Sequence, residues 1–571
     1  MQTATYTKNY QLASTRDGMG NETRYTYDPS GNQVTLTDPM GNITASEYNL
    51  AGNLVRETSP TGGVTTYTYD ALGFPLSVTD AAGLTQTMTY DLAGNMLTRT
   101  LPGGGVISAE YDQMGNVIRQ TNALGGVTTI QYDLLGRITS VTDPAGAVTA
   151  YTYDANGNLL TVTDGLGNVT TYAYDALNRL VSETAPNGAT TRYTYDSVGN
   201  LVATTDALGN VTTYTYDLNG NLISMTDALG QTVSLEYDKN GNATAAIQKN
   251  GGVIATGYDK SGRIISETDA NQNTTKYRYD KNGQVTQITD AMGQKATFEY
   301  DALGNITKIT APGKAVTLYE YDTAGRALSS TDAEGCVTLY GYNENGQIAT
   351  LTVNGNATSY EYDLAGNITA VTDAEGRRVE FTYDLSGNLV QITYPDGTAE
   401  TTEYDLLGRV VRIIPRTGLT TAYTYDSLGN VTSVAQGEQV TRYEYDLLGR
   451  LTKVITPDGA ETAYAYDALG NIIGETDPLG NTTHFAYTPE NLLAQVTYAN
   501  GATQSLTYDL AGNVISEIDG EGNTKQYQYD RVNRLIAVID EAGNKTSYGY
   551  DALDNITKAD GTVLTFAYDK T

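Results

Sequence analysis

Residues 195–215 read Y-D-S-V-G-N-L-V-A-T-T-D-A-L-G-N-V-T-T-Y-T, and this stretch decides the fold. The segment Asp-x-x-Gly-Asn occurs twice in it, at Asp196–Asn200 and at Asp206–Asn210. Each copy is followed by five or six residues rich in Val, Leu, Thr and Tyr. These residue types favour β-strands, and turn formers bound them on both sides. The stretch therefore predicts two strands and two turns.

The same pattern recurs along the whole chain. A Tyr-Asp pair returns every 21 residues, and the repeat tyrosines keep this spacing from Tyr27 to Tyr342. Tyr6 extends the series toward the start, and Tyr550 and Tyr568 extend it toward the end. A fixed period of this length is typical of repeat architectures. We expect one continuous array over residues 1–571, with about 27 repeats and no second domain.

Each repeat contains a first turn, which follows the repeat tyrosine, and a second turn about ten residues later. The aspartate that opens a turn can accept hydrogen bonds from backbone N–H groups, and the glycine supplies a positive φ. From Tyr27 onward, where the first-turn glycine is missing, asparagine or aspartate replaces it, at Asn178, Asn491, Asn533 and Asp554. These residue types tolerate the left-handed region best. The structural turn residues expected here are Asp196, Gly199, Asn200, Asp206, Gly209, Asn210, Asp217, Gly220 and Asn221.

Three copies are shorter than 21 residues, and all three deletions fall in the second turn. The copies at 342–362 and 425–445 each lack one residue, and the copy at 550–568 lacks three. The shortened turns contain Asn354-Gly355, Gln436-Gly437 and Asp560-Gly561. Asn-Gly is the strongest signal for a two-residue hairpin. A hairpin repeat explains this placement, whereas a helical repeat does not.

Alternation along a strand places Thr212, Tyr214 and Tyr216 on one face, opposite Val211 and Thr213. We expect a tyrosine ladder, formed by Tyr195, Tyr214, Tyr216 and Tyr237, in which rings of neighbouring copies stack across strands. Neither face is strongly hydrophobic, so a two-sheet sandwich is not expected. The chain should make roughly 54 antiparallel strands. Because twisted open sheets rarely exceed about 10 strands without curling, the sheet must coil, and its successive rims can cover one another.

Composition excludes several functions. The formal net charge is −32, which repels phosphate backbones and argues against nucleic-acid binding. A single cysteine, Cys336, excludes an intrachain disulfide. No apolar run is long enough to span a bilayer, and no signal peptide is visible at the start of the chain.

The candidate chemical residues occupy ordinary repeat positions. His484 is the only histidine, and no nucleophile motif accompanies it. Cys336 stands at a post-turn position, seven repeats away from that histidine. The turns carry many carboxylates, yet each has one aspartate where a calcium loop would have several, so capping is favoured over Ca²⁺. We therefore expect no catalytic residue, no metal site and no cofactor, and the tyrosines leave glycan contact open as an alternative.

The pattern Tyr-Asp-x-x-Gly-Asn…Thr-Asp-x-x-Gly-Asn-x-Thr-x-Tyr, as in 195–216, resembles the YD repeats of RHS proteins. The resemblance covers essentially the whole chain. It implies a β-sheet that spirals into a shell or barrel. In bacterial polymorphic toxins and insecticidal toxin complexes such a shell encloses a C-terminal toxin domain, and in teneurins a related barrel belongs to a cell-surface adhesion protein.

Three regions of such proteins are not seen in the sequence: an N-terminal delivery region, the RHS core and a C-terminal toxin domain. Asp477–Gly480 resembles part of the core but stands at an ordinary second turn. We expect a non-enzymatic shell or scaffold segment of a larger secreted or cell-surface protein, with a polypeptide cargo or flanking domains as partners. The alternative is an adhesin that binds glycans or proteins through its outer face. Taken alone, the segment should form an open coiled sheet with a polar interior.

Overall fold

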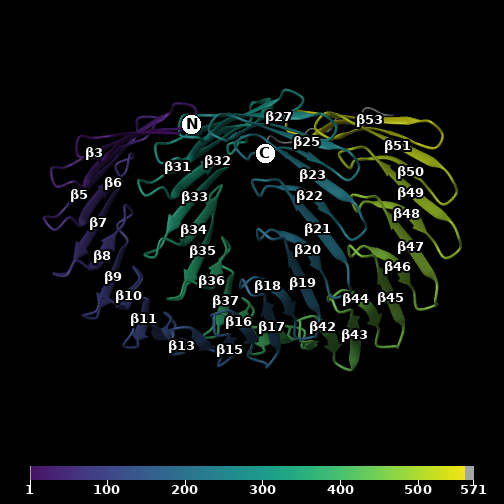
Figure 1. The fold of residues 1–571 in the computed structure, drawn as a ribbon, viewed down its shortest axis with the longest axis horizontal. Helices are drawn as coiled ribbons and strands as arrows, with labels where there is room; N and C mark the ends of the chain where they lie inside the picture. Colours follow the sequence, from purple (N-terminus) through teal and green to yellow (C-terminus); the bar gives the residue numbers. More distant parts are fainter. Residues whose placement is uncertain (1, 560–571) are drawn as a thin grey trace.

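The computed structural model describes residues 2–559. Within them the chain forms 54 antiparallel β-strands and one short 3-10 helix, η1 (Pro312–Lys314). The strands follow one another around a coiled ribbon (Figure 1). The prediction of an all-β array of hairpins is confirmed.

The strand boundaries follow the repeat. An even-numbered strand runs from the sixth to the tenth residue after a repeat tyrosine, as in β20 (Leu201–Thr205) and β22 (Leu222–Thr226). An odd-numbered strand contains a repeat tyrosine and the five residues before it, as in β21 (Val211–Tyr216) and β23 (Thr232–Tyr237). The exceptions are β1 (Thr3–Tyr6), β34 (Ile348–Val353), β35 (Asn356–Tyr362), β41 (Thr421–Tyr425), β42 (Val431–Gln436), β43 (Gln439–Tyr445) and β54 (Ile556–Ala559).

Each strand pairs with its neighbours in the sequence. β21 pairs with β22 from Thr213↔Thr226 to Tyr216↔Leu222, and a β-bulge lies just before Tyr216. On its other side β21 pairs with β20 only as far as Ala203↔Thr213, so this pair of strands is unpaired near the first turn. A bulge bends a strand and increases its twist. Because the bulge recurs at every first turn, its bend is added repeatedly along the ribbon.

Two of the three shortened turns are two-residue hairpins. Val353 pairs with Asn356 around Asn354-Gly355, and Gln436 pairs with Gln439 around Gly437-Glu438. Deleting residues from the second turn therefore extends the strands toward each other without disturbing the rest of the repeat. The third shortened turn, at Asp560-Gly561, lies outside the described residues.

Successive revolutions of the coil touch through their turns. Met19 N–H donates to Ser261 Oγ over 3.2 Å, and Asn122 Nδ2 donates to the Leu385 carbonyl over 3.0 Å. Within residues 2–559, nine hydrogen bonds of this kind join positions 238 to 264 residues apart. In each one a second turn of one revolution meets a first turn of the next. This line of contacts is called the seam below, and one revolution takes about twelve repeats.

The coil has almost no packed core. The accessible surface is 31,525 Å², whereas a compact protein of this mass exposes about 20,000 Å². Among the described residues the buried apolar side chains are few and mostly small: Ala147, Ala270, Ala370, Val496 and Ala537. Both faces of a single-layer sheet therefore remain open to water, and its stability depends on turns, ladder pairing and the seam.

Candidate functional site

The aspartate of each first turn organises the turn around itself. Asp217 Oδ1 accepts the N–H groups of Asn219 and Asn221 over 2.8 and 2.9 Å. Its Oδ2 accepts the Asn221 side-chain amide over 2.8 Å. These hydrogen bonds, first that of the Asn221 side chain, hold the pKa of Asp217 below its ordinary value. The carboxylate is committed to the turn, which is the geometry of a cap.

Asp196 and Asp206 are bonded in the same way. Asn200 donates its backbone and side-chain N–H groups to Asp196, and Asn210 does so to Asp206. The glycines that precede these asparagines have φ of 102° at Gly199 and 86° at Gly209. Asp477–Gly480 is an ordinary second turn as well, closed by a bond from the Gly480 N–H to the Asp477 carbonyl.

Gly220 is a position where only the backbone conformation limits substitution. Its φ is 84°, and a Cβ built there would meet nothing within 4 Å. We expect Gly220→Val to destabilise the turn by more than about 1 kcal/mol, because a β-branched residue strains at positive φ. Gly220→Asn should be tolerated, since Asn178 has φ of 61° at the equivalent position. Thermal melting of the two variants checks this, and equal losses would contradict the turn assignment.

The repeat tyrosines connect neighbouring hairpins through their hydroxyl groups. Tyr216 donates to the carbonyl of Leu201 over 2.9 Å, and Tyr237 donates to that of Leu222 over 2.8 Å. Tyr195 makes the same bond to Leu180. Leu201 begins β20, at the end where β20 and β21 are not paired. The hydroxyl thus satisfies a carbonyl that the strand ladder leaves without a partner.

The prediction that tyrosine rings of neighbouring repeats stack on one another is wrong. In the part of the chain that the structure describes, the one ring pair in contact is Phe74 with Tyr90, with centroids 5.3 Å apart. Tyr214 approaches a hydroxyl instead, that of Thr204 at 3.5 Å. The reason is geometric: repeat tyrosines recur on every second strand, at about 10 Å spacing, which is too far for rings to stack.

Arginine makes a second link that sequence reasoning missed. In several first turns arginine replaces the last asparagine, and Arg137 shows its role. Its Nε donates to Asp133 Oδ2 over 2.7 Å, one Nη donates to the Asp154 carbonyl over 3.1 Å, and its guanidinium lies 4.7 Å from the Tyr153 ring centre. In the sequence, this link is marked by Asp-x-x-Gly-Arg or Asp-x-x-Asn-Arg in the first turn. The guanidinium also lies over the next repeat tyrosine at Arg179, Arg263, Arg326, Arg409, Arg450 and Arg534.

The two faces of the sheet differ in chemistry. Thr212, Tyr214 and Tyr216 are half-buried, whereas Val211, Thr213 and Thr215 on the other face are exposed. The threonine face also carries exposed ion pairs, such as Glu110 with Arg119 at 3.5 Å and Glu403 with Arg412 at 3.1 Å. The sheet therefore presents one aromatic and aliphatic face and one polar, charged face.

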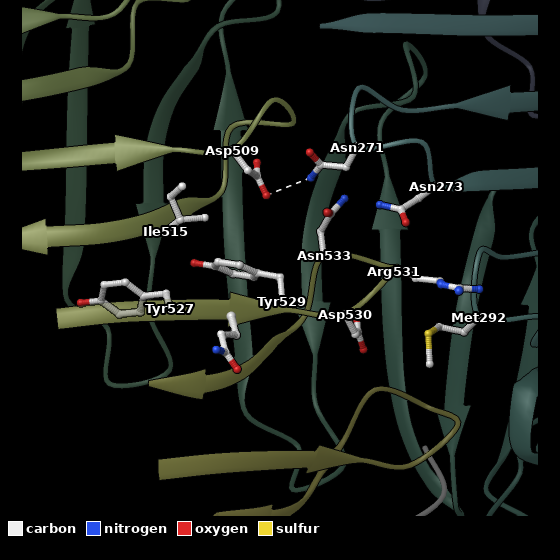
Figure 2. A pocket seen from close by; sticks show the side chains of 11 residues that line it. Asn271, Asn273, Met292, Asp509, Ile515, Tyr527, Tyr529, Asp530, Arg531 and Asn533 are labelled. Atoms are coloured by element: carbon white, nitrogen blue, oxygen red, sulfur yellow. Dashed lines mark hydrogen bonds between the residues drawn. The ribbon is translucent and has the colours of Figure 1, made fainter. Parts of the chain in front are cut away.

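A cavity of about 640 Å³ opens along the seam (Figure 2). Asn271, Asn273 and Met292 line it from one revolution, and Asp509, Tyr529 and Asn533 are among the residues that line it from the next. The Asn271 amide donates to Asp509 Oδ2 over 2.9 Å across the gap. The Asp509 carboxylate and the Asn271 amide already bond each other, so the cavity is a polar joint between revolutions.

The remaining candidate residues are separate from this cavity. His484 lies exposed on β47 (Thr482–Tyr487), where it pairs with Gly474 and Thr497. Cys336 is half-buried, and its backbone N–H donates to Asp332. No group of three His, Cys, Asp or Glu side chains in residues 2–559 is placed to hold a metal ion. We expect His484→Ala and Cys336→Ala to leave melting and binding unchanged; loss of any activity in either variant would require a catalytic role.

Comparison with known proteins identifies the repeat. The RHS Repeat sequence family matches residues 9–43, 48–85, 73–106, 111–148, 153–190, 174–211, 195–229, 216–253, 258–291, 279–316, 508–545 and 529–560, which together cover more than half of the chain. The chain belongs to the RHS repeat family. The Teneurin YD-shell family matches residues 315–406 and 344–519 of this RHS-repeat chain. No curated protein sequence matches it.

The fold of this RHS-repeat chain is similar to solved structures. The crystal structure of TcdB2-TccC3-TEV matches with a TM-score of 0.65 at 14% identity, over 98% of this chain and 41% of that chain. TcdB2-TccC3-Cdc42 matches with a TM-score of 0.63 at 15% identity, over 96% of this chain and 41% of that chain. The RHS-repeat chain thus spans about two fifths of these proteins and shares their fold. No helix in residues 2–559 has the length and hydrophobicity to cross a membrane.

Proposed function

We propose that this chain forms part of the wall of a hollow β-shell that sequesters a polypeptide, such as a toxin domain, inside a larger secreted or cell-surface protein. The observation that carries the proposal is the accessible surface of 31,525 Å². Compact packing would leave about 20,000 Å² exposed. A single-layer sheet that coils with both faces open surrounds space without filling it.

Three features support a wall rather than a catalyst. Each aspartate, tyrosine hydroxyl and arginine described above is engaged in joining one hairpin to itself or to the next. The seam joins one revolution to another through backbone carbonyls and asparagine amides. Membership of the RHS repeat family and the fold shared with TcdB2-TccC3 agree with this role. The chain itself would perform no reaction.

Limited proteolysis of a passenger tests the proposal. A domain of about 100 residues, a size that a small hollow shell can hold, is fused after Thr571. We expect residues 1–571 alone to give it little protection, because both rims of the coil are open. Extending the coil with further hairpins at its rims should slow cleavage strongly. The control is the same passenger on an unrelated carrier.

The outcomes separate the functions. Protection that grows with added hairpins supports encapsulation. Full protection by residues 1–571 supports it too, and would mean that this segment closes the shell by itself. Cleavage at the control rate in every fusion contradicts encapsulation. Binding of the same chain to immobilised glycans would then favour the adhesin.

A further inference from the structure

The two rims of the coil are built differently. The nine first turns between residues 49 and 220 are called the leucine rim, and the second and third residues of a turn are called its tip. Eight of the nine turns carry a large apolar residue at the tip, and the ninth has Ala155-Asn156. Leu50, Leu92, Leu134 and Leu218 are 94 to 110% exposed. Tip leucines of first turns that lie in the seam, such as Leu385, Leu406 and Leu447, are 42 to 50% exposed. The leucine rim therefore has the composition of a seam-forming edge but lies open.

The seam shows what such an edge binds. Second turns that lie in the seam, from Asp17 to Gly313, have no acidic residue at their two tip positions. The first tip residue is Gly, Pro or Ala in all of them but one, where it is Lys249. These tips lie close to the next revolution: Ala270 is 4% exposed, and a Cβ added at Gly18 would lie 2.0 Å from the Lys260 carbonyl oxygen. A small first tip residue therefore recurs along the seam, and none of these tips is acidic.

The opposite rim is different. Six of the nine second turns between residues 373 and 543, called the acidic rim, carry an exposed carboxylate at a tip. The six carboxylates are Glu375, Asp396, Glu438, Asp458, Glu521 and Glu541, and the other three turns carry Arg416-Thr417, Pro478-Leu479 and Ala499-Asn500. Pressed against a first turn, each would face leucine and the aspartate that opens that turn. Burial of a carboxylate and repulsion between like charges both oppose such a contact, also at Glu375 and Asp396, which pair with Arg377 and Arg416.

We propose that the leucine rim is a docking surface for the second-turn edge of another hairpin coil whose tips carry no acidic residue, and that the acidic rim prevents copies of this chain from docking there. Both rims belong to a head-to-tail contact, which would otherwise build open filaments because nothing closes it. Proteins commonly place charges where contact with an unwanted partner must be prevented. The argument rests on continuity with the seam, where equivalent residues already form the contact within one chain.

The experiment converts the acidic rim into a docking edge. The donor chain carries Glu375→Leu, Asp396→Asn, Glu438→Asn, Asp458→Asn, Glu521→Leu and Glu541→Ala; five of these six changes recreate tips found in the seam, and Glu438→Asn gives a neutral two-residue turn. It also carries Leu92→Asp, Leu134→Asp and Leu218→Asp, so that it cannot bind a second donor. These leucines are almost fully exposed, so the fold should tolerate the change. Sedimentation velocity then measures its binding to the unmodified full chain.

We expect the unmodified chain and the donor each to be monomeric, and their mixture to form a one-to-one complex. Binding should weaken at least about 100-fold when the unmodified chain also carries the three Leu→Asp changes. A charge-matched control has the three Leu→Asp changes with its acidic tips intact, and its six neutral substitutions lie on strand glutamates: Glu47, Glu110, Glu236, Glu299, Glu403 and Glu444, each changed to Gln. It should not bind.

Three results would overturn the proposal. One is a donor that does not bind the unmodified chain while its melting curve shows that it is folded. Another is a donor that binds equally well after the leucines of its partner are replaced. The last is an unmodified chain that already polymerises head to tail, since the acidic tips would then protect nothing.

Discussion

Replacing Gly63, Gly105 and Gly126 together by alanine is expected to open the seam. A Cβ at these positions would lie 2.1, 2.6 and 2.5 Å from the carbonyl oxygens of Thr323, Leu364 and Leu385, respectively. Each of these atoms belongs to the backbone of the next revolution, so one revolution must move away. Overpacking of this kind costs about 1–3 kcal/mol per site. We therefore expect faster amide exchange and faster proteolysis in first turns between residues 322 and 388.

The turn itself accepts alanine at this position, because Ala460 and Ala502 occupy it in second turns of the acidic rim, outside the seam. The effect should therefore come from the seam alone. Gly520→Ala is the control, since it lies on the acidic rim and its added Cβ meets its nearest atom, the Ala502 Cβ, at 3.2 Å. Exchange rates that change equally in the triple variant and in the control would show that the seam does not hold the revolutions together.

Acid is expected to unfold the array from its turns. Hydrogen bonds from the asparagine side chain and then the backbone lower the pKa of Asp28, Asp112, Asp217 and Asp238 below the ordinary value of 3.8. The stabilisation from such a carboxylate is fully present above pH 3.8 and is lost as the pH falls through the lowered pKa. Because the same turn recurs in almost every repeat, the losses add along the chain.

Melting temperature measured from about pH 7 to about pH 2.5 checks this. Relief of repulsion in a chain of net charge −32 should raise stability first, and the fall should begin below about pH 4. Asp217→Asn is a matched variant, since Asn49 opens a first turn elsewhere and accepts the N–H groups of Ala51 and Asn53. Changing several turn aspartates to Asn should lower the melting temperature at neutral pH and make its fall below about pH 4 less steep. An unchanged fall in acid would exclude the turn carboxylates as its cause.

Much of this protein is determined by its sequence alone. The 21-residue period, the two strands per repeat and the positions of the turns follow from local chemistry, because each repeat contains its own Asp, Gly and strand-forming residues. Asn-Gly at 354–355 even identifies a two-residue hairpin. The scarcity of apolar residues on either face correctly predicts a coiled single-layer sheet.

The tertiary structure decided every feature that depends on how far the sheet bends over many repeats. The number of repeats in one revolution results from small rotations at each bulge, which no local motif specifies. It sets which turns meet across 238 to 264 residues, and so it alone distinguishes the covered leucine tips from the exposed ones. The tyrosine hydroxyl bonds and the arginine links were hidden for the same reason: they join residues 15 to 17 positions apart, on strands whose separation is known only once the register and the bulge are fixed.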